Sequence, residues 1–205
     1  MGICYIVGAG DCTEQFAPKT GDFLIAADGG LRHLASRGLT PDLMLGDFDS
    51  FEGEMPTCPI LRYPAEKDDT DTALAIEEGV RRGYSEFRIY GALGGERIDH
   101  SVAMFSTLLA CARRGLCVRL YGGGRVLFTL KDGEYRFPEG CEGYLSVFAF
   151  GGDATGVTLA GVKYPLEDAT LTPDKPLGVS NEFLAHEAAS ISVQDGILLL
   201  ICKVF

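Results

Sequence analysis

The chain has 205 residues, of which 46% are hydrophobic and 23% are charged, and its formal net charge is −11 at pH 7. This composition is typical of a folded globular protein with a buried core, and it excludes a disordered chain. The negative charge argues against binding to nucleic acid or to anionic lipid, because such polyanions are repelled.

The seven cysteines form no C-x-x-C pair, and none lies at ligand spacing from a histidine. This pattern favours reduced thiols over disulfides or a zinc site. No apolar run is long enough to cross a bilayer, and the apolar segment 3–7 lacks the basic region of a signal peptide. We therefore expect a soluble, cytoplasmic protein without a membrane partner.

In the first part of the chain, residues 1–122, short apolar runs alternate with helical patterns. Strands are predicted at 3–7, 23–27, 43–45, 60–63, 87–90 and 117–121, and helices at 31–37, 70–82 and 100–114. The last two helices end in Arg-Arg-Gly, which places cations in the final turn and glycine after it. Such alternation predicts an α/β domain with a doubly wound, mostly parallel sheet, which binds ligands at the carboxyl ends of its strands.

In the second part, residues 123–205, short strands and Gly/Asp turns replace the helical patterns. Strands are predicted at 126–130, 135–137, 144–150, 157–159, 169–171, 187–193 and 197–205. A turn is predicted at Lys131-Asp132-Gly133 and a hairpin at Asp195-Gly196. This spacing predicts a small all-β sandwich or barrel, so the chain is expected to fold as two domains, 1–122 and 123–205.

Two loops that follow predicted strands combine glycine with acidic residues. In Ala27-Asp28-Gly29-Gly30, the glycines would let a ligand approach the backbone and the next helix, although a simple turn capped by Asp28 is the alternative. In Gly46-Asp47-Phe48-Asp49-Ser50, an extended backbone would point Asp47 and Asp49 to one side. Two such carboxylates favour a hard cation such as Mg²⁺, although a solvated acidic turn has the same appearance.

A third loop, Glu66-Lys67-Asp68-Asp69-Thr70-Asp71-Thr72, opens the helix predicted at 70–82. Asp68 and Asp71 would share one helical face, where they could hold a metal or cap the helix and complement its dipole. Lys67 could contact phosphate or balance the neighbouring acids. A second acidic cluster strengthens the metal interpretation, because Mg-nucleotide sites often take carboxylates from two loops.

The fourth loop runs from Gly91 to His100 and contains three glycines, Gly91, Gly94 and Gly95. Arg97 supplies a planar donor fork, and Asp99 is expected to cap the following helix. These features favour a polyphosphate-binding loop, with His100 more structural than catalytic. By contrast, Gly8-Ala9-Gly10 begins like a dinucleotide fingerprint, but Thr13 stands where the third glycine belongs.

Taken in order, these motifs resemble the thiamine pyrophosphokinase family. The motifs are Ala27-Asp28-Gly29-Gly30, Gly46-Asp47-Phe48-Asp49-Ser50, Lys67-Asp68-x-Thr70-Asp71, Gly94-Gly95-x-Arg97-x-Asp99-His100 and Gly178-x-Ser180-Asn181-Glu182-Phe183. The resemblance implies a catalytic, nucleotide-binding α/β domain, a thiamine-binding β-sandwich and a homodimer. It also implies transfer of the pyrophosphoryl group of Mg-ATP to the thiamine hydroxyl, with release of AMP. Met104 and Glu96 depart from the family's pattern.

The resemblance and the loop chemistry together imply a role for each motif. Asp47, Asp49, Asp68 and Asp71 would hold Mg²⁺, and Asp28, Gly29, Gly30, Lys67, Gly94, Gly95, Arg97 and His100 would bind ATP. Arg97 would neutralise charge during transfer, and Asp71 or Asp99 could accept the hydroxyl proton. Ser180 and Asn181 would contact thiamine where two subunits meet, although a turn before the next strand is the alternative.

Two other functions use the same features. A Mg-dependent phosphohydrolase would need the acidic loops but would use water as the nucleophile. A non-catalytic sensor of thiamine or nucleotide would bind without forming AMP. The complete acidic set favours the transferase over the sensor, because binding alone would not require it.

Overall fold

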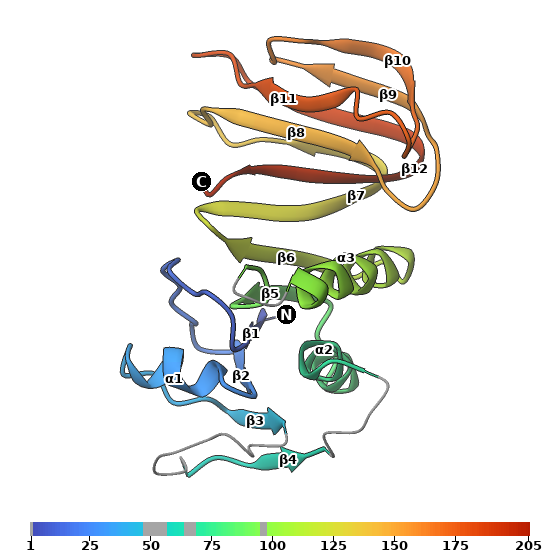
Figure 1. The fold of residues 1–205 in the computed structure, drawn as a ribbon. Helices are drawn as coiled ribbons and strands as arrows, with labels where there is room; N and C mark the ends of the chain where they lie inside the picture. The colour runs from blue at the N-terminus through green and yellow to red at the C-terminus, as the bar shows by residue number, and fades with distance from the viewer. Residues whose placement is uncertain (1, 47–56, 64–68, 95–97) are drawn as a thin grey trace. The chain divides into compact units, whose positions relative to one another are not determined.

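The structure is a computed structural model that describes residues 2–46, 57–63, 69–94 and 98–205. The chain divides into two compact units, Met1–Thr107 with Leu116–Gly123 and Leu108–Gly115 with Gly124–Phe205 (Figure 1). The first unit is a sheet with helices, and the second consists of strands apart from the short stretch Leu108–Gly115, so the predicted fold class is confirmed. Among the described residues, no helix has the length and hydrophobicity needed to cross a membrane.

The first unit contains a parallel sheet whose strands lie in the order β6-β5-β1-β2-β3-β4. The strands are β1 (Cys4–Val7), β2 (Phe23–Ala27), β3 (Leu43–Gly46), β4 (Ile60–Arg62), β5 (Glu86–Tyr90) and β6 (Cys117–Gly122). All residues of β1 and β3 are buried, as expected for parallel strands covered on both faces. After β4 the chain returns to the other side of β1, so the topological switch point lies between β1 and β5.

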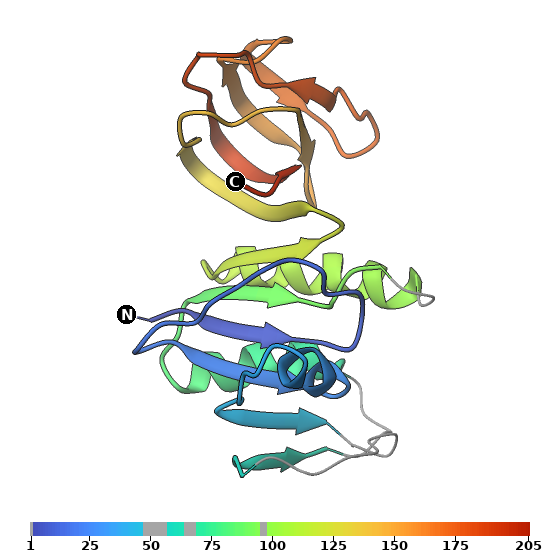
Figure 2. The same cartoon turned by 90° about the vertical axis from the view of Figure 1, so that its left-hand side faces the viewer.

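Helices cover one face of this sheet, and a short helix with an irregular segment covers the other (Figures 1 and 2). On the first face lie α2 (Asp71–Arg81) and the first half of α3 (Ile98–Arg113). A Cβ added at Gly79 in α2 would lie 2.5 Å from Phe87 Cε1, so this glycine lets the helix lie close to the sheet. On the second face lie α1 (Gly30–Ala35) and residues 8–22.

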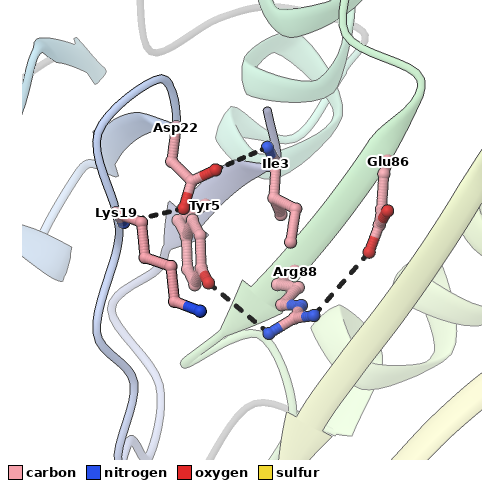
Figure 3. Close-up of polar contacts among 6 residues, drawn as sticks. All are labelled: Ile3, Tyr5, Lys19, Asp22, Glu86 and Arg88. Atoms are coloured by element: carbon pink, nitrogen blue, oxygen red, sulfur yellow. Dashed lines mark hydrogen bonds and ion pairs between the residues drawn. The ribbon is translucent and has the colours of Figure 1, made fainter. Parts of the chain in front are cut away.

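Residues 8–22, which we call the β1–β2 segment, are fixed to the sheet by aromatic and polar contacts. The Phe16 ring stacks on Tyr90 with ring centroids 4.4 Å apart. At the far end of the segment, an Asp22 carboxylate oxygen accepts a hydrogen bond of 2.8 Å from the Ile3 backbone N–H (Figure 3). The other oxygen accepts one of 2.8 Å from Lys19 N–H. Burial acts to raise the pKa of Asp22, but these hydrogen bonds outweigh it and hold the pKa below its usual range.

The structure corrects the predicted start of each helix. The side chain of Thr70, predicted to lie inside the helix, accepts a hydrogen bond from Ala73 N–H and caps α2. However, α3 begins at Ile98, so Asp99 lies in its first turn instead of at the predicted cap position. The N-cap of α1 is Gly29, with no side-chain hydrogen bond, so Asp28 is not a cap.

In the second unit, residues 124–205 form antiparallel strands arranged around one long ladder. Its strands are β7 (Arg125–Arg136), β8 (Tyr144–Ala149), β9 (Ala154–Ala160), β10 (Leu166–Leu171), β11 (Gly178–Glu182) and β12 (Ser190–Lys203). Strand β12 pairs with β7 along its length, while its first half also pairs with β9 and its second half with β8. Strand β10 extends the pairing from β9 and β11 extends it from β8, which gives the small all-β architecture that the sequence predicted.

The two Asp-Gly dipeptides do not form the turns that the sequence predicted. Both lie inside the long strands, where the β7–β12 register shifts between Val193 and Ile197. Asp132 has φ 41° and Gly196 has φ 117°, and Gly196 N–H donates a 3.0 Å hydrogen bond to Asp132 Oδ1. Residues that tolerate positive φ suit a β-bulge as well as a hairpin, so the same signal marks an irregularity within two continuous strands.

Candidate active site

Loops that follow neighbouring parallel strands meet at the carboxyl edge of the first unit's sheet. Gly8 N–H donates to Tyr90 O at 2.8 Å, and Gly10 N–H donates to Gly91 O at 2.7 Å. The loop after β1 is therefore joined to the loop after β5, across the switch point. Ligands of doubly wound sheets bind at this position, so we take this edge as the candidate site.

The glycines at this edge allow the loops to pack against each other. A Cβ at Gly8 would lie 2.6 Å from Gly91 O, and a Cβ at Gly30 would overlap the Val7 carbonyl. Gly29 is similarly close to Ala9, since a Cβ on it would lie 2.9 Å from the Ala9 Cβ. These contacts explain the glycines by close backbone approach, in addition to any contact with a ligand.

Asp28, a predicted ATP contact, has a constrained backbone at the end of β2. Its φ is 48°, in the left-handed region that non-glycine residues rarely occupy. Its N–H donates to Leu45 O at 2.7 Å, and a Cβ at Gly46 would lie 3.1 Å from its Cα. Strain of this kind persists where the surroundings impose it and is common at functional sites. Asp28 lies beside Gly46, the first residue of the predicted acidic loop.

The start of α2 brings one predicted metal ligand to the same edge. Asp71 is half-buried in the first turn, where the helix dipole favours a negative charge. A Cβ at Gly8 would lie 3.7 Å from the hydroxyl of Thr72, so this turn adjoins the loop after β1. Asp47, Asp49, Lys67 and Asp68 lie outside the described residues. Within the described ranges, no group of three or more His, Cys, Asp or Glu residues is arranged to hold a metal.

The start of α3 is attached to the loop after β5. Ser101 Oγ accepts a hydrogen bond of 3.2 Å from Gly94 N–H, and Asp99 and His100 are exposed in the first turn. Gly95, Glu96 and Arg97 lie outside the described residues. Met104 is only 3% exposed, so this departure from the family's pattern is a residue of the core.

The predicted thiamine contacts lie in the second unit, on β11. Asn181 is 3% exposed, and its Oδ1 accepts hydrogen bonds of 2.9 Å from both Tyr164 N–H and Glu182 N–H. Its Nδ2 donates to Tyr164 O at 2.8 Å. Ser180 is exposed, with φ 56°. Asn181 therefore fastens β11 to the chain at Tyr164, while Ser180 faces the surface.

Two residues near the edge were not singled out in the sequence. His33 Nε2 lies 2.8 Å from Gly10 O, and Arg37 donates hydrogen bonds of 2.6 Å to Cys12 O and 2.9 Å to His33 O. Their spacing of four residues on the predicted helix 31–37 indicated a shared face. It did not indicate the contact with the β1–β2 segment, which lies more than twenty residues earlier in the chain.

Comparison with known proteins gives the same assignment for both parts of the chain. The family described as thiamin pyrophosphokinase, catalytic domain, matches residues 17–120, and the thiamin pyrophosphokinase vitamin B1 binding domain matches residues 134–198. A thiamine pyrophosphokinase of Bacillus subtilis (strain 168) is 32% identical over 184 residues, which cover 86% of this chain and 85% of the relative.

Solved structures agree with the family match. A thiamine pyrophosphokinase structure from Bacillus subtilis has a TM-score of 0.88 at 25% identity, over 99% of each chain. A thiamin pyrophosphokinase family protein from Enterococcus faecalis has a TM-score of 0.85 at 29% identity, over 100% of each chain. The resemblance drawn from the sequence motifs is thus confirmed. The chain belongs to the thiamine pyrophosphokinase family, and it is an enzyme that transfers the pyrophosphoryl group of ATP to thiamine.

Proposed function

We propose that the transfer takes place at the carboxyl edge of the first unit's sheet, with Mg-ATP bound there. The observation that carries this proposal is that the segments with Asp28, Asp71 and Gly91–Gly94 all adjoin the loop after β1 at that edge. These residues come from three separate segments, and each was expected from the sequence to contact the nucleotide or its metal. We also propose that residues 1–122 serve the nucleotide and that residues 123–205 serve thiamine.

Asp47, Asp49, Asp68 and Asp71 are the residues that would hold Mg²⁺. Their carboxylate oxygens are the hard ligands that this ion prefers, and Asp71 is placed in the first turn of α2. When bound, the ion would neutralise charge on the phosphates. Lys67 and Arg97 would add positive charge, so that a chain with a net charge of −11 can hold an anionic nucleotide.

The remaining residues of the edge would orient the reacting groups. Asp28, Gly29, Gly30, Gly94, Gly95 and His100 are the proposed ATP contacts. Asp71 or Asp99 would accept the proton of the thiamine hydroxyl as its oxygen attacks the β-phosphorus and AMP leaves. Phosphoryl-type transfer depends mainly on positioning and charge stabilisation, which a rigid edge of packed loops provides.

For the second unit, we propose that Ser180 and Asn181 line a thiamine site at the interface of a homodimer. Four large apolar side chains on or beside β11 support a covered surface there. Their exposed fractions are 54% for Tyr144, 58% for Tyr164, 52% for Leu177 and 49% for Val179. Burying such residues in a partner's surface would remove apolar area from water. Sedimentation velocity checks the dimer, and a monomer at micromolar concentration would contradict it.

The test of the nucleotide site compares Asp71→Asn with Asp69→Asn by phosphorus NMR of reactions that contain ATP, Mg²⁺ and thiamine. Asp69 is the matched control, because it is an exposed neighbour to which we assign no role. We expect Asp71→Asn to lose about 100-fold or more in rate, since a metal ligand contributes several kcal/mol. The Asp69→Asn variant should stay within about twofold of the unmodified enzyme.

Three outcomes would contradict parts of the proposal. Near-normal turnover of folded Asp71→Asn would remove Asp71 from the site. Formation of ADP and thiamine monophosphate would mean attack at the γ-phosphorus. Loss of ATP without thiamine would indicate hydrolysis by water.

A further inference from the structure

The short helix α1 holds the loop that follows β1. His33, in α1, places Nε2 2.8 Å from Gly10 O. Because a carbonyl oxygen only accepts hydrogen bonds, Nε2 carries the proton in this contact. Arg37, just after the helix, donates to Cys12 O at 2.6 Å, and its guanidinium lies 5.4 Å from the Phe16 ring centroid. Helix and segment lie on the same face of the sheet (Figure 2).

The loop that His33 holds, residues 8–11, lies at the centre of the carboxyl edge. On one side, Gly10 N–H donates to Gly91 O at 2.7 Å, and a Cβ on Gly94 would lie 3.2 Å from Asp11 Oδ2. On the other side, Ala9 packs against Gly29, in the loop after β2. The loop after β1 therefore separates and supports the two glycine loops to which ATP contacts are assigned.

The loop contains two glycines, which leave its backbone free to adopt many conformations unless contacts fix it. The hydrogen bond to Gly10 O fixes the orientation of one peptide group in this loop. The two Arg37 contacts and the stacking of Phe16 on Tyr90 hold the segment further along the chain. Loss of the His33 contact should therefore loosen the loop locally while the segment stays attached to the sheet.

We propose that His33 is a positioning residue for pyrophosphoryl transfer, which acts by holding the Gly10 carbonyl so that the loop after β1 sets the ATP-binding loops in register. This inference rests on the proposed binding of Mg-ATP at the carboxyl edge. A misplacement of about 1 Å at a reacting centre can cost about 100-fold in rate. A small shift of the loops that hold the triphosphate is thus enough to raise the KM for ATP.

The test is a set of substitutions at His33 that separates hydrogen bonding from side-chain size. His33→Leu removes the donor, and His33→Gln keeps an amide N–H at about the distance of Nε2. His33→Asn has the same amide on a shorter side chain, so it should not reach Gly10 O. Ser36→Ala is the matched control, because it removes a 3.0 Å side-chain hydrogen bond to His33 O on the same face without touching the loop.

Steady-state kinetics are measured with each substrate varied at saturating concentration of the other. We expect His33→Leu and His33→Asn to raise the KM for ATP about tenfold while the KM for thiamine stays within about twofold. His33→Gln should bring the KM for ATP back to within about threefold of the unmodified enzyme, and Ser36→Ala should leave it unchanged. If His33→Leu does not fold, the comparison of Gln with Asn decides the question.

An unchanged KM for ATP in His33→Leu and His33→Asn would overturn the inference. The inference would also fail if the KM values for ATP and thiamine rose equally and His33→Gln were no better than His33→Asn. That pattern would indicate a general loosening of the structure. Asp71→Asn distinguishes the two levels of the proposal. If it is impaired while His33→Leu is normal, only the positioning role fails; if both are normal, the placement of Mg-ATP at this edge fails.

Discussion

Substitution of Asn181 measures how much its hydrogen bonds, which attach β11 to the chain at Tyr164, contribute to the stability of the second unit. In Asn181→Ala, the N–H and C=O of Tyr164 and the N–H of Glu182 lose their partner. Each neutral hydrogen bond contributes about 0.5–1.5 kcal/mol, and each buried group left unsatisfied costs about 1–3 kcal/mol. The Tyr164 side chain is 58% exposed, so water can reach part of this region. We therefore expect a loss of about 2–4 kcal/mol in the free energy of unfolding.

Asn181→Asp keeps the shape of the side chain and changes one atom of the hydrogen-bond pattern. One carboxylate oxygen can still accept from the two N–H groups, but the other replaces Nδ2, which lies 2.8 Å from Tyr164 O. Two acceptors in contact repel, and burial disfavours the charge, so the folded state should raise the pKa of this carboxyl. The protonated acid can donate to Tyr164 O. The deficit in stability should thus be full above the folded pKa and should shrink as pH falls toward the unfolded value of about 3.9.

Urea unfolding followed by circular dichroism, at pH 7.5 and at pH 4.5, checks both variants against the unmodified chain. Asn181→Ala should be destabilised similarly at the two pH values, whereas the deficit of Asn181→Asp should narrow at the lower one. A change below about 0.5 kcal/mol in Asn181→Ala would refute the structural role of the amide. A deficit of Asn181→Asp that does not change with pH would refute the assigned hydrogen-bond pattern. A raised KM for thiamine in a stable variant would support the proposed contact of Asn181 with thiamine.

Two further predictions concern the first unit. Gly79→Ala gains about 1 kcal/mol of helix propensity but forces a methyl group against Phe87, where overpacking costs about 1–3 kcal/mol. We expect net destabilisation by urea unfolding, and a stabilised variant would contradict the close packing of α2. Asp22 has a lowered pKa in the folded state, so its contribution to stability is present above its unfolded pKa and is lost as pH falls through the folded pKa. Asp22→Asn should be less stable than the unmodified chain at pH 7, and its free energy of unfolding should fall less between pH 5 and pH 3. A steeper fall than in the unmodified chain would contradict this.

Most elements of the first unit were predictable because their strands are continuous apolar runs between clear turn signals. The second unit was harder, since its long strands contain Asp-Gly dipeptides at bulges. Strand β11 was missed because Gly178, Ser180 and Asn181 are typical turn residues, and Ser180 indeed has a positive φ within the strand. Whether such residues form a turn or a bulge depends on long-range pairing, which a local pattern does not contain.

The site shows the same division between local and long-range information. The sequence placed Asp28 and Asp71 at one edge, because parallel strands bring the loops after them together. It did not predict the contact of His33 with Gly10, which joins residues 23 positions apart, or the burial of Asn181. These features follow from how α1 packs and how β11 pairs, which are properties of the folded chain.

The glycines predicted the site because they allow a ligand to approach the backbone, but in the structure they also allow the loops to pack against each other. Gly8 and Gly91 allow two loops to touch at the switch point, where a side chain on either would meet backbone. Packing of this kind fixes the backbone of both loops before any ligand arrives, so little ordering remains to be done on binding. For a chain of net charge −11, long-range attraction of an anionic nucleotide is not available, and loops that are already fixed in place become more important. The dense backbone packing at this edge and the proposed binding of a triphosphate are therefore two consequences of the same arrangement of glycines.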